Sequence, residues 1–192
     1  MPMTMDAPIL AFDSARKWRA WLERNSSKST GIWLRFFKKD SRVKTIVYAA
    51  ALDEALCHGW IDGQVRKHDD DSWLQKYTPR RRGGLWSKRN TLHAARLTAA
   101  GKMAPRGLAE IAAAKADGRW KRAYDSPGRM RIPADFVRAL SKNKRAEAFF
   151  ATLNKTNRDS IVWRLQTAKT PETRARRMKV ILGMMARREK FH

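Results

Sequence analysis

The stretch from Cys57 to Asn90 decides the fold. It reads Cys57-His58-Gly59-Trp60-Ile61-Asp62-Gly63-Gln64, then Tyr77-Thr78-Pro79-Arg80-Arg81-Arg82, then Leu85-Trp86-Ser87-Lys88-Arg89-Asn90. Residues 60–67 and 72–78 flank an acidic turn, His68-Asp69-Asp70-Asp71, and this pattern predicts two paired strands. Glycine lets a backbone approach a ligand closely, aromatic rings offer flat faces and arginine offers forked donors. The stretch therefore predicts one contiguous surface site beside a small sheet.

Helical patterns surround this block. Residues 14–25 form a predicted helix with Asp13 as its N-cap and Trp18 and Leu22 inward, and residues 32–39 alternate as a strand. A helix over 46–58 is expected to end at a left-handed Gly59. Further helices are predicted over 87–100, 105–117, 133–140, 144–153, 157–169 and from a Thr170 cap onward, with Trp163 and Met178 facing the core.

The elements define an α+β chain that is predominantly helical. A small antiparallel sheet with helices comes first, and a C-terminal helical module follows. We predict a domain over 1–125 that carries the Trp/Gly/Arg block and a helical module over 126–192, with a linker around 124–133. A chain of 192 residues can bury a core without disulfides or metals.

The block resembles the signature of the YdeI/OmpD-associated family, whose members are labelled bacteriocin-protection proteins. The likeness extends to Gly31-Ile32-Trp33-Leu34, Gly118-Arg119-Trp120 and Ala168-Lys169-Thr170-Pro171-Glu172-Thr173-Arg174. The resemblance implies a role in tolerance of antimicrobial peptides or stress, and it implies no reaction. It therefore favours a non-enzymatic binding or protection protein.

The net charge of +24 is distributed unevenly. Residues 1–75 carry 12 Lys/Arg and 10 Asp/Glu, whereas residues 76–192 carry 30 and 8. Such asymmetry points to a polyanion partner, either nucleic acid or an anionic surface. A solvated basic surface and an unknown protein partner are the alternatives.

The composition also predicts the compartment. The single cysteine, Cys57, excludes an intramolecular disulfide. The N-terminal residues lack the basic and apolar regions of a signal peptide, and the sequence has no run of 18 apolar residues. We expect a cytoplasmic protein without a transmembrane segment. The oligomeric state is left open.

Two groups of residues are candidates for binding. A helix that begins at Ser87 would present free backbone N–H groups to an anion, and arginines flank it. The candidates for ligand or anion binding are Trp60, Asp62, Gln64, Tyr77, Arg80, Arg81, Trp86, Ser87 and Asn90. The last helix carries arginines away from its apolar stripe, and the candidates for polyanion binding are Arg82, Arg174, Arg177, Lys179 and Arg187.

Several of these residues also have structural interpretations. Trp86 either stacks on a ligand or packs in the core. Asp62 either orients a ligand or pairs with an arginine such as Arg80. Cys57 and His58 point about 100° apart on a helix, so we predict a buried, inert thiol and a histidine at the helix end.

Metal and cofactor chemistry are not predicted. The acidic turn lacks the glycine and the bidentate glutamate of a calcium loop, so we expect no metal site. No cofactor is expected. The first alternative function is a basic nucleic-acid-binding protein. The second is an enzyme acting on a small anionic substrate, for which the sequence offers no nucleophile–base pair.

Overall fold

The computed structural model describes residues 7–126 and 129–192. The chain forms two compact units, one from residues up to Gly84 with Asn90–Trp120, the other from Leu85–Arg89 with Lys121–His192. The α+β prediction is confirmed, because the described residues hold eight α-helices, a four-stranded sheet and a helical C-terminal region. Residues 127–128 of the predicted linker and the N-terminal residues 1–6 lie outside the described part.

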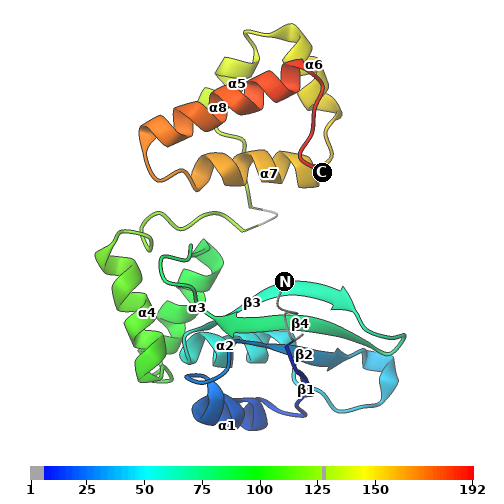
Figure 1. The fold of residues 1–192 in the computed structure, drawn as a ribbon, viewed down its shortest axis with the longest axis vertical. Helices are drawn as coiled ribbons and strands as arrows, with labels where there is room; N and C mark the ends of the chain where they lie inside the picture. Colours follow the sequence, from blue (N-terminus) through cyan, green and yellow to red (C-terminus); the bar gives the residue numbers. More distant parts are fainter. Residues whose placement is uncertain (1–6, 127–128) are drawn as a thin grey trace, which may run out of the picture. The chain divides into compact units, whose positions relative to one another are not determined.

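A mixed sheet forms the centre of the first unit (Figure 1). Its strands are β1 (Ile9–Ala11), β2 (Ile32–Phe37), β3 (Trp60–Lys67) and β4 (Ser72–Pro79), in the order β1-β2-β4-β3. β3 and β4 form the predicted antiparallel hairpin, and β2 also runs antiparallel to β4. β1 runs parallel to β2, so the sheet is mixed rather than wholly antiparallel. β1 was not predicted, because a strand of three residues is too short to show an alternating pattern.

Helices α1 (Ala15–Asn25) and α2 (Tyr48–Cys57) cover one face of the sheet (Figure 1). Successive side chains of a strand point to opposite faces, so Ile32, Leu34 and Phe36 of β2 all meet these helices. Trp18 and Leu22 of α1 are fully buried there, as predicted.

The ends of these elements differ in detail from the prediction. Ser14, not Asp13, is the N-cap of α1, and its hydroxyl accepts from the backbone N–H of Lys17. Asp13 instead pairs with the Lys17 ammonium at 2.6 Å. β4 extends one residue beyond the predicted strand over 72–78 and ends at Pro79, which pairs with Trp60. The predicted left-handed Gly59 is confirmed, with a φ of 72°.

Helices α3 (Lys88–Ala99) and α4 (Pro105–Ala116) follow the sheet, and a short 3-10 helix, η1 (Lys39–Ser41), follows β2. The α2 carboxylate of Asp53 accepts from His93 at 2.9 Å and from Arg96 at 2.6 Å, and so ties α2 to α3. Partial burial alone would raise the pKa of Asp53. The hydrogen bonds from Arg96 and His93 outweigh that effect, so its pKa lies below the usual value.

The second unit contains α5 (Ala134–Leu140), α6 (Lys144–Thr152), α7 (Lys155–Gln166) and α8 (Pro171–Ala186). Phe136, Ile161, Leu165, Ile181 and Met185 form the centre of its core. The predicted cap of the last helix is confirmed, because the Thr170 hydroxyl accepts from the backbone N–H of Thr173.

One expectation for the last helices, a core position for Trp163, is wrong, and two arginines of α8 are partly covered by neighbouring groups. Trp163 is 37% exposed, and its ring forms a T-shaped pair with Tyr124 at a centroid distance of 6.3 Å. Arg174 donates to both carboxylate oxygens of Asp135, and Arg177 donates to the carbonyl oxygen of Arg164 at 2.7 Å. These two arginines therefore do not lie on an open outer face. The reason is that α8 packs against several helices, so residues beside its apolar stripe also meet neighbours.

Within the described part of the chain, no helix has both the length and the apolar character that crossing a bilayer requires.

Candidate functional site

A hollow of about 630 Å³ lies at the β3–β4 edge of the sheet. Three of the nine predicted ligand-binding residues line it, namely Gln64, Arg80 and Arg81. The other lining residues are Thr30, Gly63, Lys76, Thr78 and Pro79. Three cationic side chains and three neutral polar ones thus surround the space, and no carboxylate lines it among the described residues. This combination suits an anion that also accepts neutral hydrogen bonds.

A β-bulge shapes the floor of the hollow. Asp62 pairs with Tyr77 and Val65 pairs with Gln75, so Gly63 and Gln64 together face Lys76. A bulge leaves its extra residue outside the regular pairing of the two strands. The buried side-chain amide of Gln75 donates to the carbonyl of Gly63 at 2.7 Å and to that of Gln64 at 3.4 Å. One buried amide therefore fixes the distortion that exposes Gly63 and Gln64 to the hollow.

Replacing this amide tests its role. We expect Gln75→Met to lower the free energy of unfolding by about 1–2 kcal/mol, because the bulge carbonyls of Gly63 and Gln64 lose the hydrogen bonds from the buried Gln75 amide. The matched control is Gln64→Met, which changes an exposed glutamine of the same bulge. Urea denaturation measures both. Equal stability of the two variants would contradict a structural role for the Gln75 amide.

The sheet face opposite α1 and α2 carries a row of cations over aromatic rings. The Arg66 guanidinium lies 4.2 Å from the centroid of Trp33, and the Lys76 ammonium lies 5.4 Å from it. The Arg35 guanidinium lies 4.3 Å from the centroid of Phe37 and pairs with Asp69 at 2.6 Å. The alternation over residues 32–39 predicted the strand, but no binding surface was predicted on this face. The signal was the interleaving of aromatic and basic residues along the outward positions of β2.

The other predicted ligand-binding residues lie away from the hollow. Trp60 and Tyr77 are fully buried in the core, and the Trp60 indole donates to the carbonyl of Ser26 at 3.1 Å. Asp62 accepts the Tyr48 hydroxyl at 2.6 Å. Trp86 and Ser87 are buried in the second unit, where Trp86 and Tyr124 share a backbone hydrogen bond of 3.0 Å. Asn90 lies at the start of α3 and does not line the hollow.

The remaining polyanion candidates differ in their surroundings. Arg82 is exposed in the loop that follows β4, and Lys179 is exposed on α8. Arg187 pairs with Glu189 at 2.9 Å. That hydrogen bond lowers the pKa of Glu189 and raises that of Arg187.

Cys57 and His58 have structural surroundings. Cys57 is buried, and burial, together with the charge of Glu54, raises the pKa of its thiol to about 11. His58 is the C-cap residue of α2, as predicted, and its Nδ1 lies 2.9 Å from the carbonyl oxygen of Glu54. A thiol with so high a pKa is protonated at neutral pH and is a poor nucleophile. Across the described ranges, no group of three His, Cys, Asp or Glu side chains could hold a metal ion.

The fold and hollow define an α+β protein with a cationic site at a sheet edge, which no carboxylate of the described residues lines, and with a helical second unit. The chain belongs to the family described as Domain of unknown function (DUF8412), whose model matches residues 10–110. The family model described as Bacteriocin-protection, YdeI or OmpD-Associated matches residues 129–188, which confirms the resemblance at family level. The 57–90 block, which first suggested that resemblance, falls within the first match. No curated protein matches the chain, and no solved structure does.

Proposed function

We propose that this is a cytoplasmic, non-enzymatic binding protein that contributes to stress or antimicrobial-peptide tolerance by binding an anionic partner. The hollow at the β3–β4 edge carries the proposal. Lys76, Arg80 and Arg81 line it, together with neutral polar groups and no carboxylate in the described chain. Guanidinium groups bind carboxylate and phosphate oxygens through paired, charge-assisted hydrogen bonds.

The charge of the protein favours an anionic partner over direct capture of a peptide. A cationic antimicrobial peptide would meet a protein of net charge +24, and like charges repel at long range. An anion would be attracted by the same field. Protection would therefore act through an anionic cell component rather than through sequestration of the peptide.

The surroundings of the reactive groups support binding over catalysis. The Cys57 thiol is buried with a raised pKa, and the His58 ring contacts a backbone carbonyl. Asp62 forms a hydrogen bond with Tyr48. Asp53 forms hydrogen bonds with His93 and Arg96. The three polar groups thus have structural partners, the thiol is buried, and none of these four residues lines the hollow.

Nucleic acid is the second candidate partner, and the outer face of the sheet favours it. Arg35, Arg66 and Lys76 form a cationic row there, and Lys76 also lines the hollow. Trp33 beneath the row is only 4% exposed, so a base has little ring surface to stack on. The row would therefore contact phosphates and bind nucleic acid without sequence preference.

A binding experiment with two probes tests both candidates. Inorganic pyrophosphate is titrated by calorimetry, and a fluorescent oligothymidylate is titrated by anisotropy across a salt series. We expect Arg80→Gln/Arg81→Gln to weaken pyrophosphate binding by about tenfold or more, because two charge-assisted contacts in the hollow are lost. If the oligonucleotide is the partner and follows the outer-face row, Arg66→Gln/Lys76→Gln should flatten the slope of log K against log salt by about 1.4.

The matched control is Arg138→Gln/Arg145→Gln, which removes two exposed arginines from the second unit. This variant has the same net charge as the hollow variant and should bind nearly as well as the wild type. Equal losses in both variants would assign the binding to net charge and overturn the proposed site. If neither pyrophosphate nor the oligonucleotide binds at low salt, both candidate functions are rejected.

A further inference from the structure

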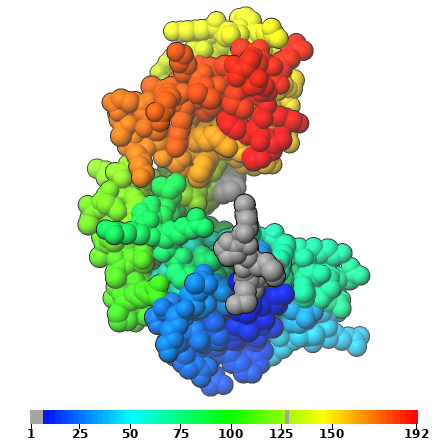
Figure 2. Space-filling view, in the orientation of Figure 1, coloured from blue at the N-terminus to red at the C-terminus, as the bar shows by residue number. Residues whose placement is uncertain are grey.

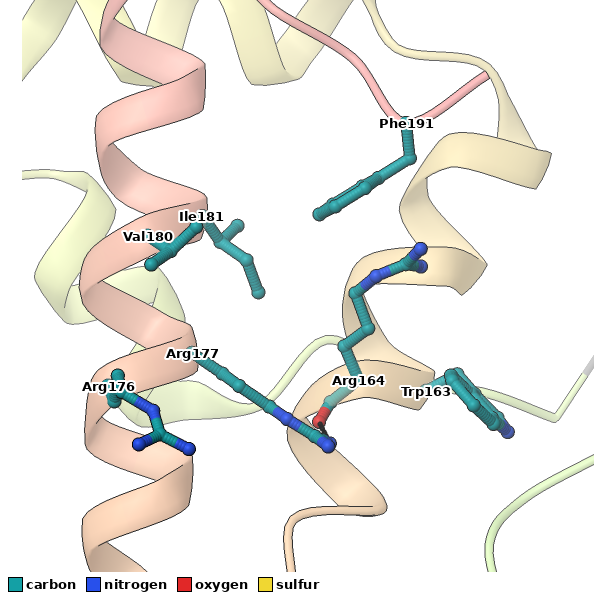
Figure 3. Close-up of a pocket in the computed structure, with 7 residues that line it drawn as sticks. All are labelled: Trp163, Arg164, Arg176, Arg177, Val180, Ile181 and Phe191. Carbon is teal, nitrogen blue, oxygen red and sulfur yellow. Dashed lines mark hydrogen bonds between the residues drawn. The ribbon is translucent and has the colours of Figure 1, made fainter.

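A second pocket, of about 360 Å³, lies within the helical unit between α7, α8 and the C-terminal segment (Figure 3). Val180 and Ile181 of α8 face the ring of Phe191 across it. Figure 2 shows the C-terminal residues, in red, as part of the surface of this unit. The volume falls within the range of small-molecule sites, and the wall from these three residues is apolar.

Three guanidinium groups, from Arg164, Arg176 and Arg177, share this apolar pocket. Arg164 stacks on Phe191, with 3.8 Å between the guanidinium carbon and the ring centroid. Arg177 donates to the carbonyl oxygen of Arg164 at 2.7 Å and to the Thr167 hydroxyl at 3.2 Å. Arg176 is exposed at the mouth.

Arg164 and Arg177 contact neutral protein groups. In the described residues, none of the three forms an ion pair, and no carboxylate lines the pocket. Burial lowers the pKa of Arg164, and the nearby charge of Arg177 lowers it further. A cluster of like charges on an apolar wall is unfavourable until an anion enters.

We propose that this pocket binds a small amphiphilic anion, with an apolar or aromatic body and one sulfonate, phosphate or carboxylate group. The apolar body contacts Val180, Ile181 and Phe191, and the anionic group faces the guanidinium groups of Arg176 and Arg177 at the other end of the pocket (Figure 3). The partly exposed indole of Trp163 at the rim adds a flat apolar surface. The site is independent of the sheet-edge hollow, because every lining residue belongs to the second unit.

Isothermal titration calorimetry of the full chain tests the proposal with three probes. Naphthalene-1-sulfonate carries both the apolar body and the charge, naphthalene-1-methanol carries only the body, and inorganic sulfate carries only the charge. We expect one sulfonate per chain, bound at least about tenfold more tightly than either of the other two, because only the sulfonate satisfies both parts of the pocket.

Two substitutions on the same helix separate the site from the overall charge. Arg176→Gln should weaken sulfonate binding by about tenfold. Lys179→Gln removes an equal charge from an exposed residue that does not line the pocket, so it should leave the affinity within about twofold. Both residues are exposed, so both variants should keep the wild-type melting temperature. Val180→Glu places a carboxylate at the mouth of the pocket. This variant should bind the sulfonate no more tightly than the neutral alcohol.

Three results would overturn the proposal. One is equal affinity for the sulfonate and the neutral alcohol, which would show a purely apolar pocket. Another is an equal loss in Arg176→Gln and Lys179→Gln, which would show a general effect of charge. The third is absence of sulfonate binding. Arg80→Gln/Arg81→Gln should leave the affinity for the sulfonate unchanged. A failure of the pocket proposal can therefore be distinguished from a failure of the binding function proposed for the hollow.

Discussion

Trp18→Ala is expected to lower the free energy of unfolding by about 3–5 kcal/mol, the range typical of large aromatic truncations in a core. The indole is fully buried between α1 and the sheet. Its ring lies 5.2 Å from Phe12, 5.3 Å from Trp21 and 5.7 Å from Tyr77, measured between centroids. Its N–H also donates to the carbonyl of Ala51 at 3.1 Å. The substitution therefore opens a cavity among aromatic rings and removes a buried donor.

The matched control is Trp163→Ala, which removes the same side chain from a position that is 37% exposed. Its contacts are fewer, so we expect a loss of about 1 kcal/mol or less. Guanidinium denaturation followed by circular dichroism measures both variants. A loss for Trp18→Ala as small as that for Trp163→Ala would contradict the central position of Trp18.

Local patterns were sufficient to predict most of the elements. The hairpin over 60–67 and 72–78 followed from alternation on both sides of an acidic turn, and the structure places β3 and β4 there. Helix ends were also predictable where one residue carries the signal, as at Gly59 and Thr170. In each case the physical cause lies within a few residues of the position that it governs.

The arrangement of the site depends on contacts that are distant in sequence. Gln75 reaches the bulge carbonyls 11 and 12 residues earlier, and a bulge leaves no periodic signal in a single strand. The motif block also contributes to both compact units, because Trp86 and Ser87 pair with the 121–126 segment of the second unit. Of the predicted ligand-binding residues, the hollow therefore brings together only Gln64, Arg80 and Arg81.

The partners of the α8 arginines are also distant in sequence and could not be predicted from local patterns. Helical periodicity correctly separated Ile181 and Met185 from the charged residues. It cannot show that Arg174 meets Asp135, 39 residues earlier, or that Arg177 meets the carbonyl of Arg164. The hydrogen bonds from Arg174 lower the pKa of Asp135, so this interaction stabilises the fold above the ordinary pKa of the carboxyl and is lost as the pH falls through the lowered value.

Gly107→Ala should lower the free energy of unfolding by about 2–4 kcal/mol, although alanine is the better helix former by about 1 kcal/mol. Gly107 is buried in α4, where that helix crosses the end of α2. A Cβ atom there would collide with the carbonyl oxygen of Cys57 and lie 2.8 Å from its carbon and 2.7 Å from the Met103 methyl. A hydrogen bond holds the Cys57 carbonyl in place, because its oxygen accepts from the backbone N–H of Ala104 at 3.0 Å.

The second helical glycine provides a control of opposite sign. Gly183 lies in α8, and a Cβ atom there would meet only the flexible end of Arg187, at 3.3 Å. The higher helix propensity of alanine then determines the sign of the stability change. Gly183→Ala should raise the free energy of unfolding by up to about 1 kcal/mol. Urea denaturation of both variants gives the comparison. If Gly107→Ala were neutral or stabilising, α4 would have room to move away from α2, and the close helix crossing would not be a fixed part of the first unit. If both variants lost stability equally, the loss at Gly107 could not be assigned to the collision with Cys57.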